Sequence, residues 1–83
     1  MDYYLKPSAL KDLRSLTREI QKRILQKLDF YTHTDNPLKF AERLRYPELG
    51  EFKFRMGDYR IIFDVENGKI IILKIGHRRD IYK

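Results

Sequence analysis

Two turns in the last third of the chain constrain the fold more than any other feature. From Glu51 onward apolar and polar residues alternate, which is the period of a strand with one buried face. The alternation breaks at Gly57-Asp58 and again at Asn67-Gly68, and the second pair is a strong predictor of a two-residue hairpin turn. We therefore predict three consecutive antiparallel strands over residues 51–56, 59–65 and 69–75.

The first half of the chain has helical periodicity instead. Aromatic and apolar residues before Pro7 predict a short strand over residues 2–6, because proline cannot continue the hydrogen-bond ladder. Pro7 also suits the start of a helix that continues to about Thr17, where a second, longer helix begins with Thr17 as its cap. The apolar faces expected for the two helices are Leu10, Leu13 and Leu16, and Ile20, Ile24, Leu28 and Tyr31.

A turn-rich segment follows the second helix. Pro37 is expected to open a short third helix that carries Leu38, Phe40, Ala41 and Leu44, before a loop over residues 46–50. The predicted order is strand, helix, helix, strand, strand, strand. This order predicts an α+β fold with two helices and a short third helix on one face of a twisted antiparallel sheet. Because 83 residues are few, we expect a single domain over residues 1–83.

The composition limits the chemistry. The absence of cysteine excludes disulfides and a cysteine nucleophile, and it is compatible with a reducing cytosol. The two isolated histidines, His33 and His77, do not make a closed metal site, so we expect neither a metal nor a cofactor. His33 lies among threonines and is interpreted as a polar loop residue. The longest apolar run, residues 70–73, is too short for a signal peptide or a membrane span, which predicts a cytoplasmic protein.

The first predicted hairpin collects positive charge on one face. Its turn places Arg55 opposite Arg60, with Lys53 on the same face, while the opposite face is apolar and receives the helices. Like charges across a ladder are destabilising, and a phosphodiester bound over them would replace repulsion with bidentate hydrogen bonds. Glu51 opposite Asp64 is a second like-charged pair. The alternative is that both arginines extend into water. A net charge of +6 favours a polyanion partner without specifying it.

The last strand is apolar on both faces. Its expected register places Ile71, Leu73 and Ile75 on the face of Ile62, away from the helices, and Lys74 on the helix side. Such an apolar patch is either a surface for a partner or the buried face of a central strand.

The C-terminal segment holds an imidazole, two guanidiniums and a phenol, in His77, Arg78, Arg79 and Tyr82. RNA cleavage without metal needs a base for the ribose 2′-OH, cations for the charged phosphorane, an acid for the leaving oxygen and a ring for the splayed base. The alternative is that Ile81 and Tyr82 only anchor the terminus in the core.

Two segments, Phe52-Lys53-Phe54-Arg55-Met56-Gly57-Asp58-Tyr59-Arg60-Ile61-Ile62-Phe63 and Ile75-Gly76-His77-Arg78-Arg79-Asp80-Ile81-Tyr82, resemble the RelE branch of the RelE/ParE toxin superfamily. The resemblance implies a RelE-like fold and a toxin of a toxin–antitoxin system. It also implies a metal-independent endoribonuclease that cleaves mRNA in the ribosomal A site by 2′-OH attack, leaving a cyclic phosphate. Such a toxin is a monomer that assembles with a cognate antitoxin.

The resemblance also implies a role for each matching residue. Arg55 and Arg60 would bind the scissile phosphate, Lys53 would act as base or charge stabiliser, Arg78 would assist the leaving oxygen, and Tyr82 would orient the nucleotide. Three secondary candidates are left open: Glu51, which stands where relatives have a second lysine, Arg79, which is an alternative to Arg78, and His77, a possible acid.

Two other functions remain open. A ParE-like protein shares this fold and inhibits DNA gyrase without catalysis. A plain RNA-binding module would present aromatic side chains on the sheet face, whereas the aromatic residues of the predicted hairpin point to the core.

Overall fold

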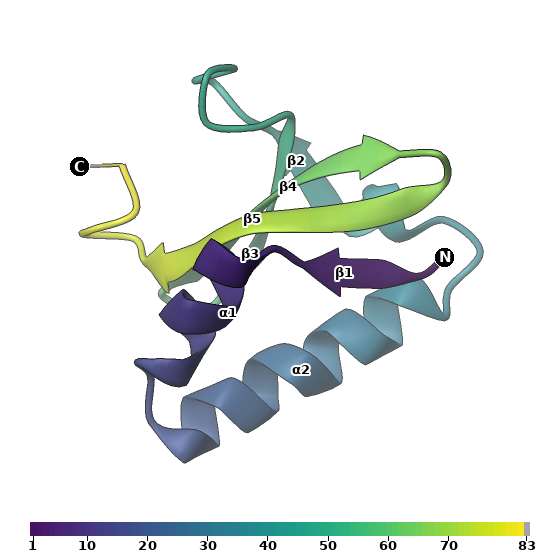
Figure 1. Cartoon of the computed structure of the whole chain (residues 1–83). Coiled ribbons are helices and arrows are strands. Elements are labelled where there is room, and N and C mark those ends of the chain that lie inside the picture. Colours follow the sequence, from purple (N-terminus) through teal and green to yellow (C-terminus); the bar gives the residue numbers. More distant parts are fainter. Residues whose placement is uncertain (83) are drawn as a thin grey trace.

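The computed structural model describes residues 1–82, and in this part of the chain two α-helices cover one face of a mixed sheet (Figure 1). The strand order across the sheet is β1-β5-β4-β3-β2. The expected α+β arrangement is therefore confirmed. The elements are β1 (Tyr3–Leu5), α1 (Pro7–Arg14), α2 (Arg18–Thr32), a 3₁₀ helix η1 (Pro37–Phe40), β2 (Ala41–Arg43), β3 (Phe52–Met56), β4 (Tyr59–Glu66) and β5 (Lys69–His77).

The predicted meander is present with its turns in the expected places. β3 and β4 pair so that Arg55 lies opposite Arg60, as the Gly57-Asp58 turn required. In the second turn Asn67 and Gly68 have φ values of 50° and 75°. Positive φ at both central residues is the requirement of the turn type that best matches the twist of a hairpin.

Two parts of the sheet differ from the expectation. β1 pairs with β5 in parallel rather than antiparallel. The two helices provide the long crossover that a parallel pair needs. The sequence did not predict this direction, because the periodicity of a strand is the same in parallel and antiparallel pairs. The expected third helix is limited to η1, and the chain then forms β2, whose Ala41 pairs with Phe54 on β3. Pairing with the open edge of β3 satisfies this segment's backbone in place of helical hydrogen bonds.

The helices begin where the sequence predicts and are tied to the sheet edge. The Thr17 hydroxyl accepts a hydrogen bond from the Ile20 amide at 3.4 Å, which caps α2. Beyond the end of β1, the hydroxyl of Ser8 donates to the Leu73 carbonyl and the carboxylate of Asp12 accepts the Ile75 amide. α1 thereby covers the edge of β5 that β1 leaves open. No helix within residues 1–82 is long and apolar enough to cross a membrane.

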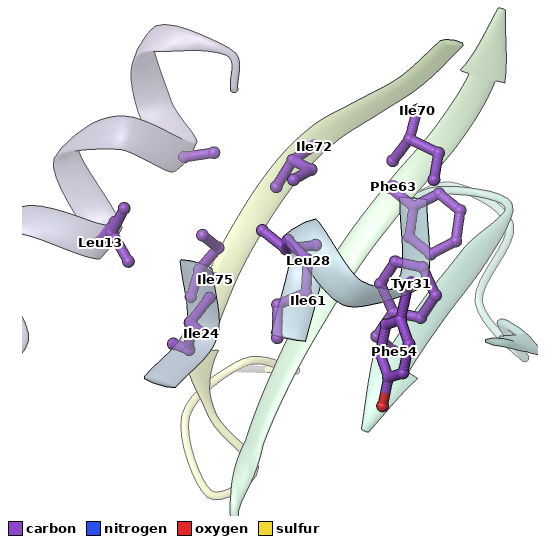
Figure 2. Packing of buried hydrophobic residues seen from close by; sticks show 11 residues of the cluster. Leu13, Ile24, Leu28, Tyr31, Phe54, Ile61, Phe63, Ile70, Ile72 and Ile75 are labelled. Carbon is purple, nitrogen blue, oxygen red and sulfur yellow. The ribbon is translucent and has the colours of Figure 1, made fainter. Parts of the chain in front are cut away.

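The main core lies between α2 and the sheet. Figure 2 shows Ile24, Leu28 and Tyr31 on α2 facing the apolar side chains of the central strands. Phe54 and Phe63 are fully buried and stacked, with ring centroids 4.5 Å apart. The helix-facing side of the hairpin is thus the side that the sequence pattern assigned to the core.

A smaller core lies on the other face of the sheet. There Ile62 packs with Leu44 and Ile81, so the β2–β3 loop and the C-terminal turn cover this part of the sheet (Figure 1). The expected position of Ile75 is wrong, since it joins the main core. The cause is a bulge between Ile62 and Phe63, where β5 contributes one extra residue and the alternation reverses. Lys74, which pairs with Ile62, is displaced by the same bulge.

Candidate functional site

A contact between Lys53 and Tyr82 joins the sheet to the C-terminal turn. Lys53 is the second residue of β3, and its ammonium donates to the Tyr82 hydroxyl at 3.2 Å. The same ammonium lies 5.6 Å from the centroid of the Tyr82 ring, within the range of a cation–π interaction. Ile81, 1% exposed, holds the turn against Ile62, while Tyr82 stays 37% exposed. The alternative of a core anchor therefore applies to Ile81 and not to Tyr82.

The carboxylate of Glu42 lies between two of the predicted site cations. Glu42 is opposite Lys53 in the β2–β3 ladder. Its two oxygens lie 3.9 Å from the Lys53 ammonium and 3.4 Å from the Arg55 guanidinium. The side chains of Arg55 and Glu42 are 58% and 51% exposed, so solvent weakens this ion pair. An exposed pair of this kind can open for a stronger anion such as a phosphate.

Arg60 is held inside the hairpin turn. Its side chain is buried, with the residue only 6% exposed, and Nη1 donates to the carbonyl oxygens of Gly57 and Tyr59 at 2.8 and 2.9 Å. These acceptors hold the Nη1 end of the guanidinium in the turn without a bound anion. The opposition of Arg55 and Arg60 thus does not by itself require a ligand, and Arg60 does not extend into water.

Arg78 lies beside the same turn. Its backbone amide donates to the Asp58 carbonyl at 2.7 Å, and its Nε lies 3.5 Å from the Asp58 carboxylate. The Arg78 side chain is 61% exposed. Because Gly76 on β5 is opposite Arg60 on β4, the C-terminal turn leaves the sheet next to Arg60. Arg78 is therefore near the hairpin turn, whereas Lys53 and Tyr82 form a separate contact farther along β3.

Glu51 is committed to the sheet. Its carboxylate accepts the Val65 amide at 3.0 Å, and its own amide donates to the Asp64 carboxylate at 2.9 Å. The expected repulsion between Glu51 and Asp64 is therefore offset by a backbone N–H for each carboxylate. The carboxylate that contacts Lys53 is that of Glu42.

His77 and Arg79 are directed away from this face. His77 is opposite Tyr59 in the ladder, and Tyr59 packs against the main core on the helix side. The two rings meet edge to face at 5.5 Å, and His77 Nδ1 accepts the Arg79 amide. Arg79 and His77 line a pocket beside Asp12 of α1. His33, interpreted as a polar loop residue, ends α2 and is exposed.

Two residues of the site were not anticipated from the sequence, Glu42 and Tyr46. Tyr46 follows β2, is 46% exposed, and its ring centroid lies 5.8 Å from that of Tyr82. Together with Lys53 and Tyr82 these residues line a pocket of about 310 Å³. The sequence did not predict the position of Glu42, because the three residues of β2 are too few to show the alternation of a strand. Tyr46 lies in the loop after β2, where no periodicity predicts which way a side chain points.

The cations Lys53 and Arg55 and the phenols Tyr46 and Tyr82 are accessible on one side of the sheet, which fits an anionic ligand that carries a ring. Comparison with known proteins identifies the family. The model of the ParE toxin of type II toxin–antitoxin systems (parDE) matches residues 3–82. The chain belongs to this toxin family. Within the RelE/ParE superfamily the toxin is RelE-like, as its sequence resemblance implied.

Individual relatives support the same assignment. The toxin is 32% identical to Toxin RelG of Mycobacterium tuberculosis over 78 residues, which are 92% of this chain and 88% of RelG. The toxin–antitoxin complex RelBE2 of the same organism has a TM-score of 0.74 at 25% identity and covers 93% of this chain and 96% of its own. The RelB-RelE complex of Methanococcus jannaschii gives 0.72 at 26% identity, with coverage of 95% and 94%.

Proposed function

We infer that this toxin is a metal-independent endoribonuclease that cleaves mRNA in the ribosomal A site in the cytoplasm. The observation that supports the inference most is the contact of the Lys53 ammonium with the Tyr82 hydroxyl, next to the exposed guanidinium of Arg55. The two cations, Lys53 and Arg55, suit the charge of an RNA phosphate, and the phenol of Tyr82 suits the ring of its nucleotide.

The chemistry that these groups support is attack by the ribose 2′-oxygen on the neighbouring phosphorus. A base removes the 2′-OH proton, the bond from O2′ to phosphorus forms, and the bond from phosphorus to the 5′-oxygen breaks as that oxygen gains a proton. The products are a 2′,3′-cyclic phosphate and a 5′-hydroxyl. Lys53 and Arg55 stabilise the charge that accumulates on the phosphorane, and Tyr82 orients the nucleotide.

Arg60 and Arg78 have supporting roles in the proposal. Arg60 uses only Nη1 for the two turn carbonyls, and a guanidinium has further donors on Nε and Nη2. Arg78 is exposed beside the turn, from which it assists the leaving oxygen once its weak pairing with Asp58 opens.

A cognate antitoxin is the proposed protein partner, with the toxin monomeric until they assemble. The support is that the related solved structures named above are toxin–antitoxin complexes.

The nuclease proposal is tested by single-turnover cleavage of mRNA on programmed ribosomes. Lys53→Ala is expected to slow cleavage by about 100- to 1000-fold, the usual loss when one group that stabilises transition-state charge is removed. The matched control is Lys69→Ala, since Lys69 lies at the other end of the sheet in the β4–β5 hairpin. Equal rates for the two variants would refute the assigned site, and no cleavage by the unmodified toxin would refute the activity.

The second candidate is non-catalytic inhibition of DNA gyrase, which the match to the ParE toxin model favours. Induction in cells, followed by mapping of mRNA ends and measurement of DNA supercoiling, separates the two. Cuts inside codons support the nuclease. Broken chromosomes with intact mRNA support the gyrase inhibitor.

A further inference from the structure

We propose that Tyr46 and Tyr82 together form the aromatic lining of a nucleobase pocket that binds one nucleotide next to the scissile phosphate. The inference rests on the proposed nuclease function and names a recognition residue, Tyr46, that the resemblance did not assign. The pocket lies on the sheet face away from the main core, between the β2–β3 loop and the C-terminal turn.

The size of the pocket suits one nucleotide. Its volume of about 310 Å³ is at the lower end of the range of small-molecule sites, which is about 300–1,000 Å³. Glu42 and Lys53 lie at the strand side, and Tyr46 and Tyr82 come from the two segments that flank it. A longer peptide or a folded surface would need a larger groove.

The rings are placed to hold a base rather than to fill a core. Their planes are inclined by 50° and their centroids are 5.8 Å apart, so the rings contact each other as a tilted pair, and a base would stack on an accessible outer face of the pair rather than between the rings. Tyr46 and Tyr82 remain 46% and 37% exposed. Splayed RNA bases stack on accessible aromatic faces of this kind.

The charges beside the rings favour a nucleotide over an uncharged aromatic ligand. Lys53 contacts the Tyr82 hydroxyl, and Arg45 also lines the pocket, whereas the guanidinium of Arg43 lies over the Phe52 ring. Glu42 is the acidic residue among the lining side chains, and it already pairs with Lys53. A ligand that combines a ring with an adjacent phosphate satisfies both features.

The direct test uses the absence of tryptophan from the chain. The Y46W variant carries a single tryptophan in the pocket, and its fluorescence is measured during titration with a 2′-O-methyl trinucleotide, which cannot be cleaved. We expect saturable quenching by this trinucleotide and much less by one of equal charge whose bases are absent. Equal quenching by both, or no quenching at millimolar concentration, would overturn the proposal.

The matched control is Y4W. Tyr4 is 54% exposed and lies on β1, at the opposite edge of the sheet from β2. Its fluorescence should not respond to either trinucleotide. A response equal to that of Y46W would indicate nonspecific binding to the positively charged surface and would count against the pocket.

Kinetics separate recognition from a structural role of the loop. Y46A is expected to raise the KM for cleavage on ribosomes by about 5- to 150-fold, the usual effect of removing one stacked base contact, with a much smaller change in kcat. Y46F, which keeps the ring, should recover most of the affinity, and Y4A should not raise KM. A fall in kcat and in thermal stability without a change in KM would show that Tyr46 only supports the loop.

Failure of this proposal and failure of the nuclease function give different results. If the toxin does not cleave mRNA but Y46W is quenched by the base-containing trinucleotide, the pocket exists without the chemistry. If the toxin cleaves mRNA while Y46W shows no quenching and Y46A keeps its KM, only the pocket is excluded.

Discussion

Arg55 and Arg60 face each other across the β3–β4 ladder, yet their guanidiniums lie in different environments. Arg55 is exposed and pairs with Glu42 at 3.4 Å. Arg60 is buried and donates to two carbonyls of the hairpin turn. Two arginines that are equivalent in the sequence pattern therefore have different roles, and substitution should distinguish them.

Arg60→Ala is expected to lower the free energy of unfolding by about 1–3 kcal/mol, because it removes a buried side chain and its two charge-assisted hydrogen bonds to the turn carbonyls. Arg55→Ala should change it by less than about 0.5 kcal/mol, as is usual for an exposed ion pair. Urea denaturation of both variants measures the difference. Equal losses would contradict the assigned environments. Any loss of cleavage by Arg60→Ala must then be measured on folded protein.

Glu42→Gln is expected to raise the affinity for a short RNA by about two- to fivefold, because it frees Lys53 and Arg55 from a competing anion. The salt dependence of binding should also become steeper, since more cations are available to phosphate. The control is Glu66→Gln, which makes the same change in net charge at the last residue of β4, beside the β4–β5 turn. If the two variants gain equally, the effect is due to net charge alone.

Tyr3→Phe tests the pH dependence of stability. Burial, followed by the charge of Asp29 and the hydrogen bond to it, raises the pKa of the Tyr3 hydroxyl above its ordinary value. The unfolded chain therefore loses this proton first, so the stabilisation is complete below pH about 10 and is lost as the pH rises above it.

The variant should be less stable than the unmodified toxin by about 0.5–1 kcal/mol near neutral pH. The gap should narrow as the pH approaches about 11, because phenylalanine has no proton to lose. Urea denaturation at both pH values measures it. A gap that widens with pH would show that the pKa shift has the opposite sign.

Gly50→Ala is expected to destabilise the loop that carries Tyr46. A Cβ at Gly50 would lie 2.6 Å from the Cγ2 atom of Ile62, at a φ of +154°. The strain and the clash together should cost about 1–3 kcal/mol. Gly68→Ala, where a Cβ meets nothing within 4 Å, is the control for positive φ alone. Thermal denaturation that ranks the control as the less stable variant would contradict the contact.

The sequence was sufficient for features that depend on neighbouring residues. The turns at Gly57-Asp58 and Asn67-Gly68 set the pairing of Arg55 with Arg60 and the face of Lys53, because a two-residue turn fixes the register locally. The family resemblance assigned Lys53 and Tyr82 to one site, but the direct contact between them was not predicted.

Features that depend on distant partners were missed. β2 has three residues, too few for alternation to distinguish a strand from a helix, so Glu42 was not recognised as a neighbour of Lys53. The bulge beside Ile62 adds one residue to β5, and periodicity alone does not reveal an extra residue. The carbonyl acceptors of Arg60 depend on side-chain direction within the turn, which spacing does not determine.

Under the proposed function, toxicity depends on Ile81, which packs against Ile62 and is too buried to contact RNA itself. A smaller side chain at position 81 would loosen the turn and let Tyr82 drift from Lys53, even if the helices and the hairpin stayed folded. Selections for cells that survive expression of the toxin should therefore recover substitutions of this isoleucine alongside those of the cations themselves.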